Sequence, residues 1–285
     1  MNGAIENLLR DIIYLINVED ATTLIALGLD EFMLPVYNLI MNIQVLIMQP
    51  VAYTILAIFI LLEIQKISTK VEQAGGAPTL GFELIFKTLV KLIICKIVVD
   101  NVQLILDAIL GVSNMLVTDI FRYSQDQQIA GQIIETFMSH IRSFNFWQRM
   151  TMFMNLLIVS LVALVLKVFI EVTLYIRFFE LYIFAAIAPI PVATMPNEEF
   201  SSIGKGYFKG FVAVGLQGVF LALVLAIYPA ILDGILTRSS IGSVGGGLPL
   251  RGPYVIMGSL LLYMLVIFLT INKTKQWAKS VVNVS

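Results

Sequence analysis

Hydrophobic residues recur along the chain in long blocks that short polar segments separate. The first block runs to about Ile67, with its most apolar part at roughly 45–62, and a second block covers about 84–106. Blocks of roughly 20 apolar residues are long enough to cross about 30 Å of hydrocarbon as a helix. The pattern therefore predicts membrane-spanning α-helices.

The later blocks predict further helices of the same kind. An apolar stretch at roughly 151–195 is too long for one crossing, so it is either one span plus a partial or re-entrant segment, or two spans joined by a tight turn. Two more blocks follow at about 210–232 and 253–271. We expect an N-terminal extracytoplasmic region, two helices, an extracytoplasmic segment, a helical core and a basic tail at 1–30, 31–107, 108–150, 151–271 and 272–285.

The N-terminal region predicts an amphipathic helix. Ile5, Leu9 and Ile12 recur at helical spacing, while Glu6 and Arg10 fall on the opposite side. The segment is too short and too polar to span a bilayer. It fits a helix that lies in the headgroup plane or one that packs on a neighbouring subunit, and both placements stay open.

Composition supports a membrane protein. Of the 285 residues, 59% are hydrophobic and only 13% are charged, which leaves too little polar surface to cover a soluble globule. We therefore predict an all-α multipass protein with about five net crossings, made by five to six membrane segments. The single cysteine excludes a disulfide within the chain, and one cysteine with one histidine gives no reason to expect a metal ion or cofactor.

The placement of lysine predicts the orientation. If 151–195 counts as one crossing, the lysine-bearing connectors near 66–70 and 205–209 fall on the same side as the tail at 273–279. Lysine and arginine are enriched on the cytoplasmic side of membrane proteins. We expect a protein of the cytoplasmic membrane with its N-terminus outside and its C-terminus inside.

Four polar residues form a stripe near the end of the second block. On one continuous helix, Lys96, Asp100, Gln103 and Asp107 fall within roughly 60° of one another. Charged groups at membrane depth avoid lipid, so the stripe predicts either a face that lines a lumen or a hydrogen-bonded seam between helices.

The long apolar stretch contains two pairs of opposite charge. Lys167 and Glu171 are four residues apart, and Arg177 and Glu180 are three apart. Such pairs fit anchoring near a membrane boundary or steps of a proton path. Because the charges are few and locally paired, the pattern favours anchoring.

Pro189 and Pro191 predict a helix break, since proline has no backbone N–H to donate. Broken helices at membrane depth often serve transport, but a simple helix end before the polar connector at 196–209 explains the prolines equally well. Further along, small residues at four-residue spacing predict close helix packing at Gly218, Ala222 and Ala226.

Aromatic and basic residues alternate just before the long stretch, in HIRSFNFWQRM. This alternation suits aromatic rings that stack on unpaired bases while arginines contact phosphates. It also suits an aromatic belt at the membrane surface, and this second interpretation is favoured because the apolar stretch begins directly afterwards. The residues are Arg142, Phe144, Phe146, Trp147 and Arg149.

Enzyme signatures are absent from the sequence. There is no HExxH, no GxSxG and no complete Walker A motif, so we predict a protein that is not an enzyme. Any energy for its function has to come from other proteins.

Three segments together resemble a known family. They are YIRFFELYIFAAIAPIPVATM at 175–195, GKGYFKGF at 204–211 and VGLQGVFLALVLAIYPAIL at 214–232. Over roughly 150–270 the chain resembles the TrbL-like (VirB/TrbL) polytopic membrane subunits of type IV secretion systems, in the form encoded by Gram-positive conjugative elements.

The resemblance implies an integral component of a conjugative DNA-transfer channel. It implies homo-oligomers, contact with ATPases and other secretion subunits, contact with membrane lipid, and transient contact with single-stranded DNA along 107–150. It transfers no catalytic residue. The alternatives from the sequence are an ion-coupled permease that uses Lys96, Asp100 and the proline break, and a purely structural scaffold.

Overall fold

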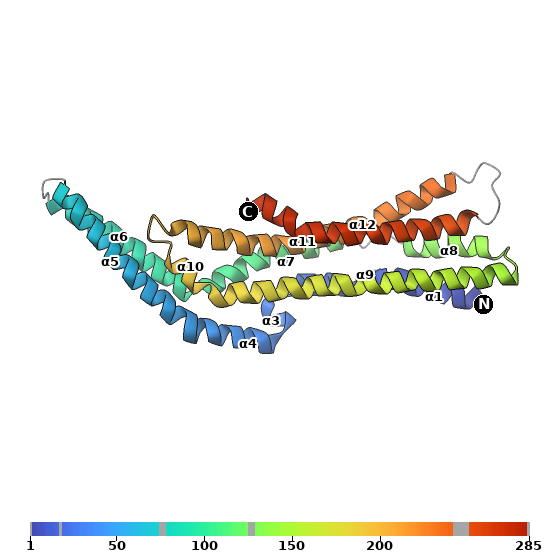
Figure 1. The fold of residues 1–285 in the computed structure, drawn as a ribbon, viewed down its shortest axis with the longest axis horizontal. Coiled ribbons are helices and arrows are strands. Elements are labelled where there is room, and N and C mark those ends of the chain that lie inside the picture. Colours follow the sequence, from blue (N-terminus) through green and yellow to red (C-terminus); the bar gives the residue numbers. More distant parts are fainter. Residues whose placement is uncertain (1, 17–18, 74–77, 125–128, 242–250, 284–285) are drawn as a thin grey trace. The chain divides into compact units, whose positions relative to one another are not determined.

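The computed structural model describes residues 2–16, 19–73, 78–124, 129–241 and 251–283, and every regular element in these residues is helical (Figure 1). The all-α fold is therefore confirmed. The elements are α1 (Asn2–Ile16), α2 (Glu19–Ala26), α3 (Leu29–Phe32), α4 (Leu34–Ile43), the π-helical η1 (Gln44–Met48), α5 (Gln49–Gln73), α6 (Pro78–Asp100), α7 (Val102–Ser124), α8 (Ile129–Ile141), α9 (Phe146–Ile187), α10 (Pro189–Ala193), α11 (Ser201–Ile241) and α12 (Arg251–Val282).

The chain forms two compact units, each with its own hydrophobic core. Unit 1 consists of Met1–Ala26, Asn114–Ile176 and Gln217–Trp277. In this unit the apolar face of α1 is fully buried through Ile5, Leu9 and Ile12, and α1 packs against α8. The sequence predicted that this helix lies in the headgroup plane or packs on a neighbouring subunit. In the structure its apolar face packs within the chain itself. The apolar face is instead covered by Phe137 and Ile141 in the same core.

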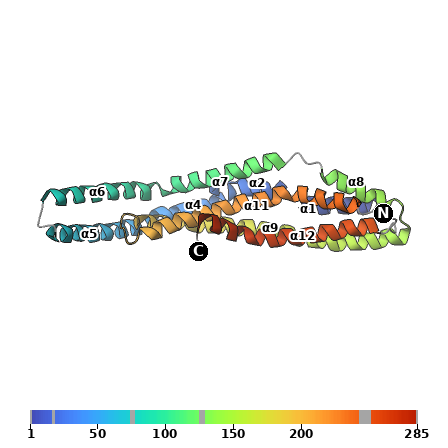
Figure 2. The ribbon, with the colours of Figure 1, turned by 90° about the horizontal axis from the view of Figure 1, so that it is seen from above.

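Unit 2 is built around a pair of neighbouring helices and the break that follows α9. It consists of Leu27–Ser113, Arg177–Leu216 and Ala278–Ser285. Within it α5 and α6 lie side by side, as both views show (Figures 1 and 2). The short helix α10 packs against both of them. The proline segment therefore lies against α5 and α6.

Helix α9 settles the alternatives for the long apolar stretch. It is one continuous helix of 42 residues, about 63 Å long at ~1.5 Å per residue. A tight turn between two spans is therefore wrong. The physical reason is that 146–187 contains neither glycine nor proline, so no residue in it favours a turn.

Among the residues that the structure describes, five helical segments are long and apolar enough to cross a membrane, which agrees with the expected number. They are Leu34–Gln73, Val102–Tyr123, Phe146–Ile187, Ser201–Ile227 and Ile256–Val282. The second differs from the expected span at 84–106, because it lies in α7 and not in α6. Lysines interrupt the apolar sequence of α6 at Lys87, Lys91 and Lys96, whereas the central part of α7 has none.

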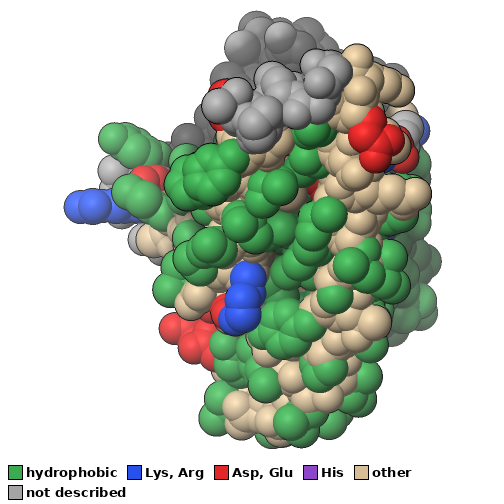
Figure 3. All heavy atoms as spheres, turned by 90° about the vertical axis from the view of Figure 1, so that its left-hand side faces the viewer, with side chains coloured by type: hydrophobic (Ala, Val, Ile, Leu, Met, Phe, Trp, Pro, Cys, Tyr) green, Lys and Arg blue, Asp and Glu red, His purple; other side chains and the backbone are tan. Residues whose placement is uncertain are grey.

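Unit 2 exposes much apolar surface. Figure 3, which views the molecule from the left-hand side of Figure 1, shows many hydrophobic side chains on the face turned to the viewer. Leu46 and Leu61 of the first candidate span and Phe82 of α6 are each more than two thirds exposed. Contiguous apolar surface of this extent is typical of contact with lipid or with other subunits.

Continuity of α9 predicts a distance between spin labels. In a Cys95→Ser background, we expect labels at Met154→Cys and Ile183→Cys to lie about 44 Å apart, whereas Met154→Cys and Val172→Cys should lie about 27 Å apart. All three positions are exposed on the helix. Double electron–electron resonance in lipid nanodiscs measures both. A shorter distance for the first pair than for the second would mean that the helix folds back.

Candidate functional site

The break between α9 and α10 leaves backbone carbonyls without their usual donors. Helix α9 ends at Ile187, α10 begins at Pro189, and both Pro189 and Pro191 are buried. In a continuous helix the N–H of residue 189 would donate to the carbonyl of Ala185. Since proline has no N–H, this donor is missing, and the only backbone donor to the Ala185 carbonyl in the described residues is the Ala188 N–H, at a long 3.4 Å.

Side chains from other helices donate to the carbonyls around the break. Gln44 Nε2 donates to the Ala185 carbonyl at 2.8 Å, and the Tyr207 hydroxyl donates to the Phe184 carbonyl at 2.7 Å. Cys95 Sγ donates to the Val192 carbonyl at 3.4 Å. The donors come from η1, α11 and α6, so the break joins these helices at one place.

A glycine permits α11 to reach the break. A Cβ atom on Gly204 would lie 2.7 Å from the Pro191 carbonyl oxygen, closer than carbon and oxygen can approach. A Cβ on Gly210 would lie 3.2 Å from the Phe184 ring. These two glycines therefore set how closely α11 approaches the end of α9.

The predicted small-residue face lies further along α11, outside the break. Gly218 and Ala222 are buried and Ala226 is half-buried. Leu221 and Ala222 belong to the core of unit 1. Their surroundings are those of helix-packing residues, a role that stays a prediction.

The connector after α10 is attached to α5 and α6 by ion pairs. Lys66 Nζ lies 2.6 Å from Glu199 Oε1, and Lys91 Nζ lies 3.5 Å from Glu198 Oε1. These pairs are largely exposed, so each contributes little free energy. They nevertheless show that the lysine-bearing end of α5 and the connector lie together in unit 2.

The predicted polar stripe is divided between two helices. Lys96 pairs with Asp100 at 2.7 Å near the end of α6, and Gln103 Nε2 donates to Asp107 at 2.7 Å on α7. Asn101 separates the helices, so the single continuous helix on which the stripe was drawn is wrong there. The four residues still form two local pairs.

Asp100 also accepts a hydrogen bond from another helix. The Tyr53 hydroxyl donates to Asp100 Oδ1 at 2.5 Å, and the Lys96 ammonium lies 5.6 Å from the centre of the Tyr53 ring. The hydrogen bonds from Lys96 and Tyr53 hold the pKa of Asp100, which lies outside the five candidate spans, below its ordinary value. This carboxylate is therefore ionised at neutral pH.

The polar face continues on α7 beyond the residues that the sequence analysis selected. Asn114 is half-buried, and Thr118 and Arg122 are exposed, each three or four residues from the next. With Gln103 and Asp107 they recur at helical spacing along one side of α7. The helical spacing of these polar residues can be read from the sequence. It was not considered because the span was expected to end at 106.

The charges of α9 have two different surroundings. Lys167 and Glu171 are partly exposed and 3.9 Å apart. Arg177 is buried and donates from Nε to the Val214 carbonyl of α11 at 3.3 Å. Glu180 is half-buried. Arg177 therefore joins α9 to α11 inside unit 2, a contact that local spacing could not reveal.

The aromatic and basic residues around the start of α9 do not form one surface. Phe144 is buried in the core of unit 1, whereas Phe146 and Trp147 are 65% and 77% exposed. Arg149 Nη2 donates to the Arg142 carbonyl at 3.3 Å. The exposed part thus consists of the two adjacent rings of Phe146 and Trp147 and of Arg142, while Arg149 is bonded to the backbone.

In the residues that the structure describes, no three side chains of His, Cys, Asp or Glu gather as a metal site would require. The organised features are apolar helices, a capped helix break and exposed polar pairs. They define a multipass helical membrane protein.

Comparison with known families identifies the kind of membrane protein. A family model described as "TrbL/VirB6 plasmid conjugal transfer like protein" matches residues 16–189, and the chain belongs to this family. The match includes the first resembling segment up to Pro189, while the other two lie outside it. Searches of curated proteins and of solved structures give no match. The chain is therefore a membrane component of a type IV secretion or conjugation system.

The hydrogen bond of Gln44 at the helix break predicts that the effects of substituting Gln44 and Pro189 on stability depend on each other. Gln44→Leu should lower the free energy of unfolding by about 1–3 kcal/mol, because it leaves the Ala185 carbonyl buried without its best donor. In a Pro189→Ala background the cost should shrink, since the new N–H of residue 189 can donate to that carbonyl. Unfolding in detergent, followed by circular dichroism, measures the four free energies of this double-mutant cycle.

The matched control is Pro191→Ala. Its new N–H faces the Ile187 carbonyl and not that of Ala185, so Gln44→Leu should keep its full cost in this background. Equal costs of Gln44→Leu in both proline variants would show that Gln44 does not replace the missing backbone donor.

Proposed function

We propose that this chain forms part of the wall of a conjugative DNA-transfer channel and that several copies surround the passage. The observation that carries the proposal is the polar face of α7. Asp107 is exposed on the single chain although it lies within the candidate span Val102–Tyr123.

A carboxylate in this position is unfavourable against lipid. Moving a charged side chain to the middle of a bilayer costs about 2.5–3.5 kcal/mol even on the most lenient scale, and Asp107, which lies nearer the end of its span, bears a smaller cost of the same sign. The bond from Gln103 satisfies only part of the hydrogen-bonding capacity of Asp107. The polar face of α7 therefore belongs against a neighbouring copy or a water-filled passage.

The helix break supports a channel wall more than a permease. Ion-coupled carriers use the carbonyls of broken helices to bind ions. Here Gln44, Tyr207 and Cys95 donate to carbonyls at the break. These carbonyls are engaged in joining helices, as expected of a scaffold that also holds partner subunits.

Partners supply what the chain does not contain. Its sequence has no nucleotide-binding motif, so ATPases of the secretion system would provide the energy for transfer. Phe146, Trp147 and Arg142 are exposed. They fit transient stacking with single-stranded DNA and contact with its phosphates, while an aromatic belt at the membrane surface is the alternative role.

The orientation proposed is N-terminus outside and C-terminus in the cytoplasm. If α7 and not α6 crosses, the lysines of α6 lie on the same side as Lys66 and Lys70. The ion pairs of Lys66 with Glu199 and Lys91 with Glu198 bring the connector before Lys205 to this group. The gathering of lysines supports the cytoplasmic assignment of that side.

Cysteine labelling tests the orientation. In a Cys95→Ser background we expect Tyr123→Cys, near the end of α7, to react with a membrane-impermeant maleimide added to whole cells. Ser280→Cys, near the end of α12, should react only after the cells are permeabilised. Both positions are exposed. Labelling of Ser280→Cys in intact cells would reverse the assignment.

A substitution on the polar face tests the role in transfer. Asp107→Asn should lower the conjugation frequency of donor cells at least tenfold, because it removes a charge from the proposed passage, while the amount of protein in the membrane stays unchanged. The matched control Asp119→Asn changes an exposed aspartate on another side of the same helix and should have little effect.

Several outcomes would contradict the channel role. Equal transfer in wild type and Asp107→Asn would show that the face does not line the passage. Loss of the protein from the membrane, or of its complexes with partner subunits, would assign Asp107 to assembly. Uptake of solutes by liposomes that contain the chain alone would favour a permease.

A further inference from the structure

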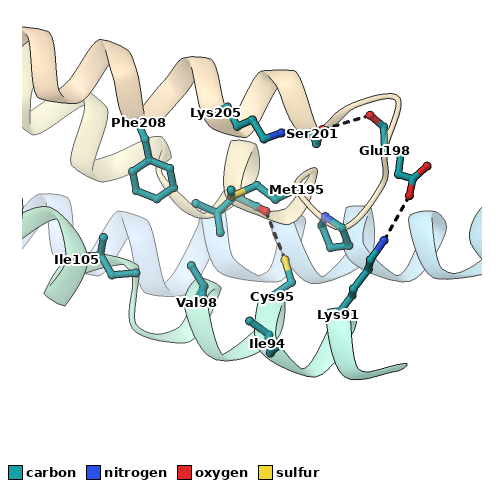
Figure 4. Close-up of a pocket in the computed structure, with 12 residues that line it drawn as sticks. Lys91, Ile94, Cys95, Val98, Ile105, Met195, Glu198, Ser201, Lys205 and Phe208 are labelled. Atoms are coloured by element: carbon teal, nitrogen blue, oxygen red, sulfur yellow. Dashed lines mark hydrogen bonds and ion pairs between the residues drawn. The ribbon is translucent and has the colours of Figure 1, made fainter. Parts of the chain in front are cut away.

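A groove of about 650 Å³ lies beside the helix break in unit 2. Its walls come from α6, the start of α7, α10, the connector and the start of α11 (Figure 4). The volume falls within the range of about 300–1,000 Å³ that is typical of small-molecule sites. The helix break and its connector therefore border a cavity of ligand size.

The two ends of the groove differ in chemistry. Figure 4 shows Val98, Ile105 and Phe208 toward one end, and Lys91 with Glu198 at the other. The middle is apolar and includes Cys95. A ligand that fills the groove would thus have an apolar body and a polar head.

The polar end has an excess of positive charge. Lys91 and Lys205 line the groove together with a single carboxylate, that of Glu198. Lys205 forms no ion pair with any residue that the structure describes, and the pair of Lys91 with Glu198 is long at 3.5 Å and exposed. The first residue of α11, Ser201, also lines this end, where the N-terminus of the helix favours an anion. The head of the ligand is therefore negative.

We propose that the groove binds one anionic phospholipid, with its phosphate near Lys205 and Lys91 and an acyl chain along Val98, Ile105 and Phe208. Phospholipid surrounds any membrane protein, and anionic headgroups collect at basic pockets between helices on the cytoplasmic side. The proposal depends on the membrane location of the chain and not on its role in DNA transfer.

An acyl chain accounts for the part of the groove that a free anion leaves empty. Inorganic phosphate would occupy the charged end only and leave the walls near Phe208 in contact with water, at a cost that grows with apolar area. A bound lipid would cover these walls and contact both α6 and α11. The lipid would then also stabilise the connector, on the side of the connector that lines the groove.

Lipid retention tests the site. The full chain is reconstituted in nanodiscs of mixed phosphatidylglycerol and phosphatidylcholine, transferred to detergent, and weighed with its retained lipid by native mass spectrometry. We expect wild type to retain one phosphatidylglycerol in preference to phosphatidylcholine. Lys205→Gln should reduce this retention about fivefold, as expected for about 1 kcal/mol per lysine near an anionic headgroup.

Two further variants separate the contributions. Lys209→Gln removes a lysine one turn further along α11 that does not line the groove, and it should retain the lipid as wild type does. Val98→Trp fills the apolar end without changing a charge and should reduce retention as well. Circular dichroism and size-exclusion chromatography establish that each variant is folded.

The only cysteine provides a second measurement without substitution. Burial raises the pKa of the Cys95 thiol to about 11, so labelling by a small maleimide is slow and is followed at pH 9. Phosphatidylglycerol should slow the labelling further, whereas inorganic phosphate and phosphatidylcholine should not.

Three results would overturn the proposal. Equal retention of both lipids by wild type would exclude a specific anionic site. Equal loss in Lys205→Gln and Lys209→Gln would indicate general attraction to a basic surface. Protection of Cys95 by inorganic phosphate to the same extent as by the lipid would assign the groove to a free anion.

Discussion

The structure of unit 2 depends on hydrogen-bond donors for a helix that proline interrupts. In an apolar environment an unsatisfied carbonyl costs several kcal/mol, and water is not at hand to replace the missing donor. Pro189 removes the usual helical donor of the Ala185 carbonyl. The Ala188 N–H donates to this carbonyl only at 3.4 Å, whereas Gln44 donates to it at 2.8 Å. A local property of the proline ring thus determines a contact between residues 141 positions apart.

The same constraint organises the neighbouring helices. Tyr207 and Cys95 donate to carbonyls on either side of the break, and Gly204 allows α11 to approach it. The connector that follows lies against α5 and α6, where Glu199 pairs with Lys66 and Glu198 pairs with Lys91. Its ion pairs and the groove beside it are consequences of this arrangement.

The sequence predicted the features that depend on local pattern. The number of candidate spans followed from apolar block length, and the conjugation family followed from segments such as FFELYIFAAIAPIPVATM. The second span was misplaced because the apolar residues of α6 outweighed its lysines, Lys87, Lys91 and Lys96. The donors Gln44 and Tyr207 were not predicted, since each acts on a carbonyl that only the folded chain brings near. The roles of the selected polar residues remain predictions.

The single chain leaves one of its surfaces unexplained by folding alone. The buried side of α7 carries Leu106 and Leu110 in the core of unit 2, while Gln103 and Asp107 occupy another side of the same helix. If α7 faced lipid on that side, selection for stability would favour apolar residues there, as on the exposed sides of α5. Within the chain Tyr37 of α4 forms a hydrogen bond with Gln103, while Asp107 remains exposed. A charged group on the exposed side of a candidate span favours a polar neighbour over lipid, and the proposed passage between several copies would supply one.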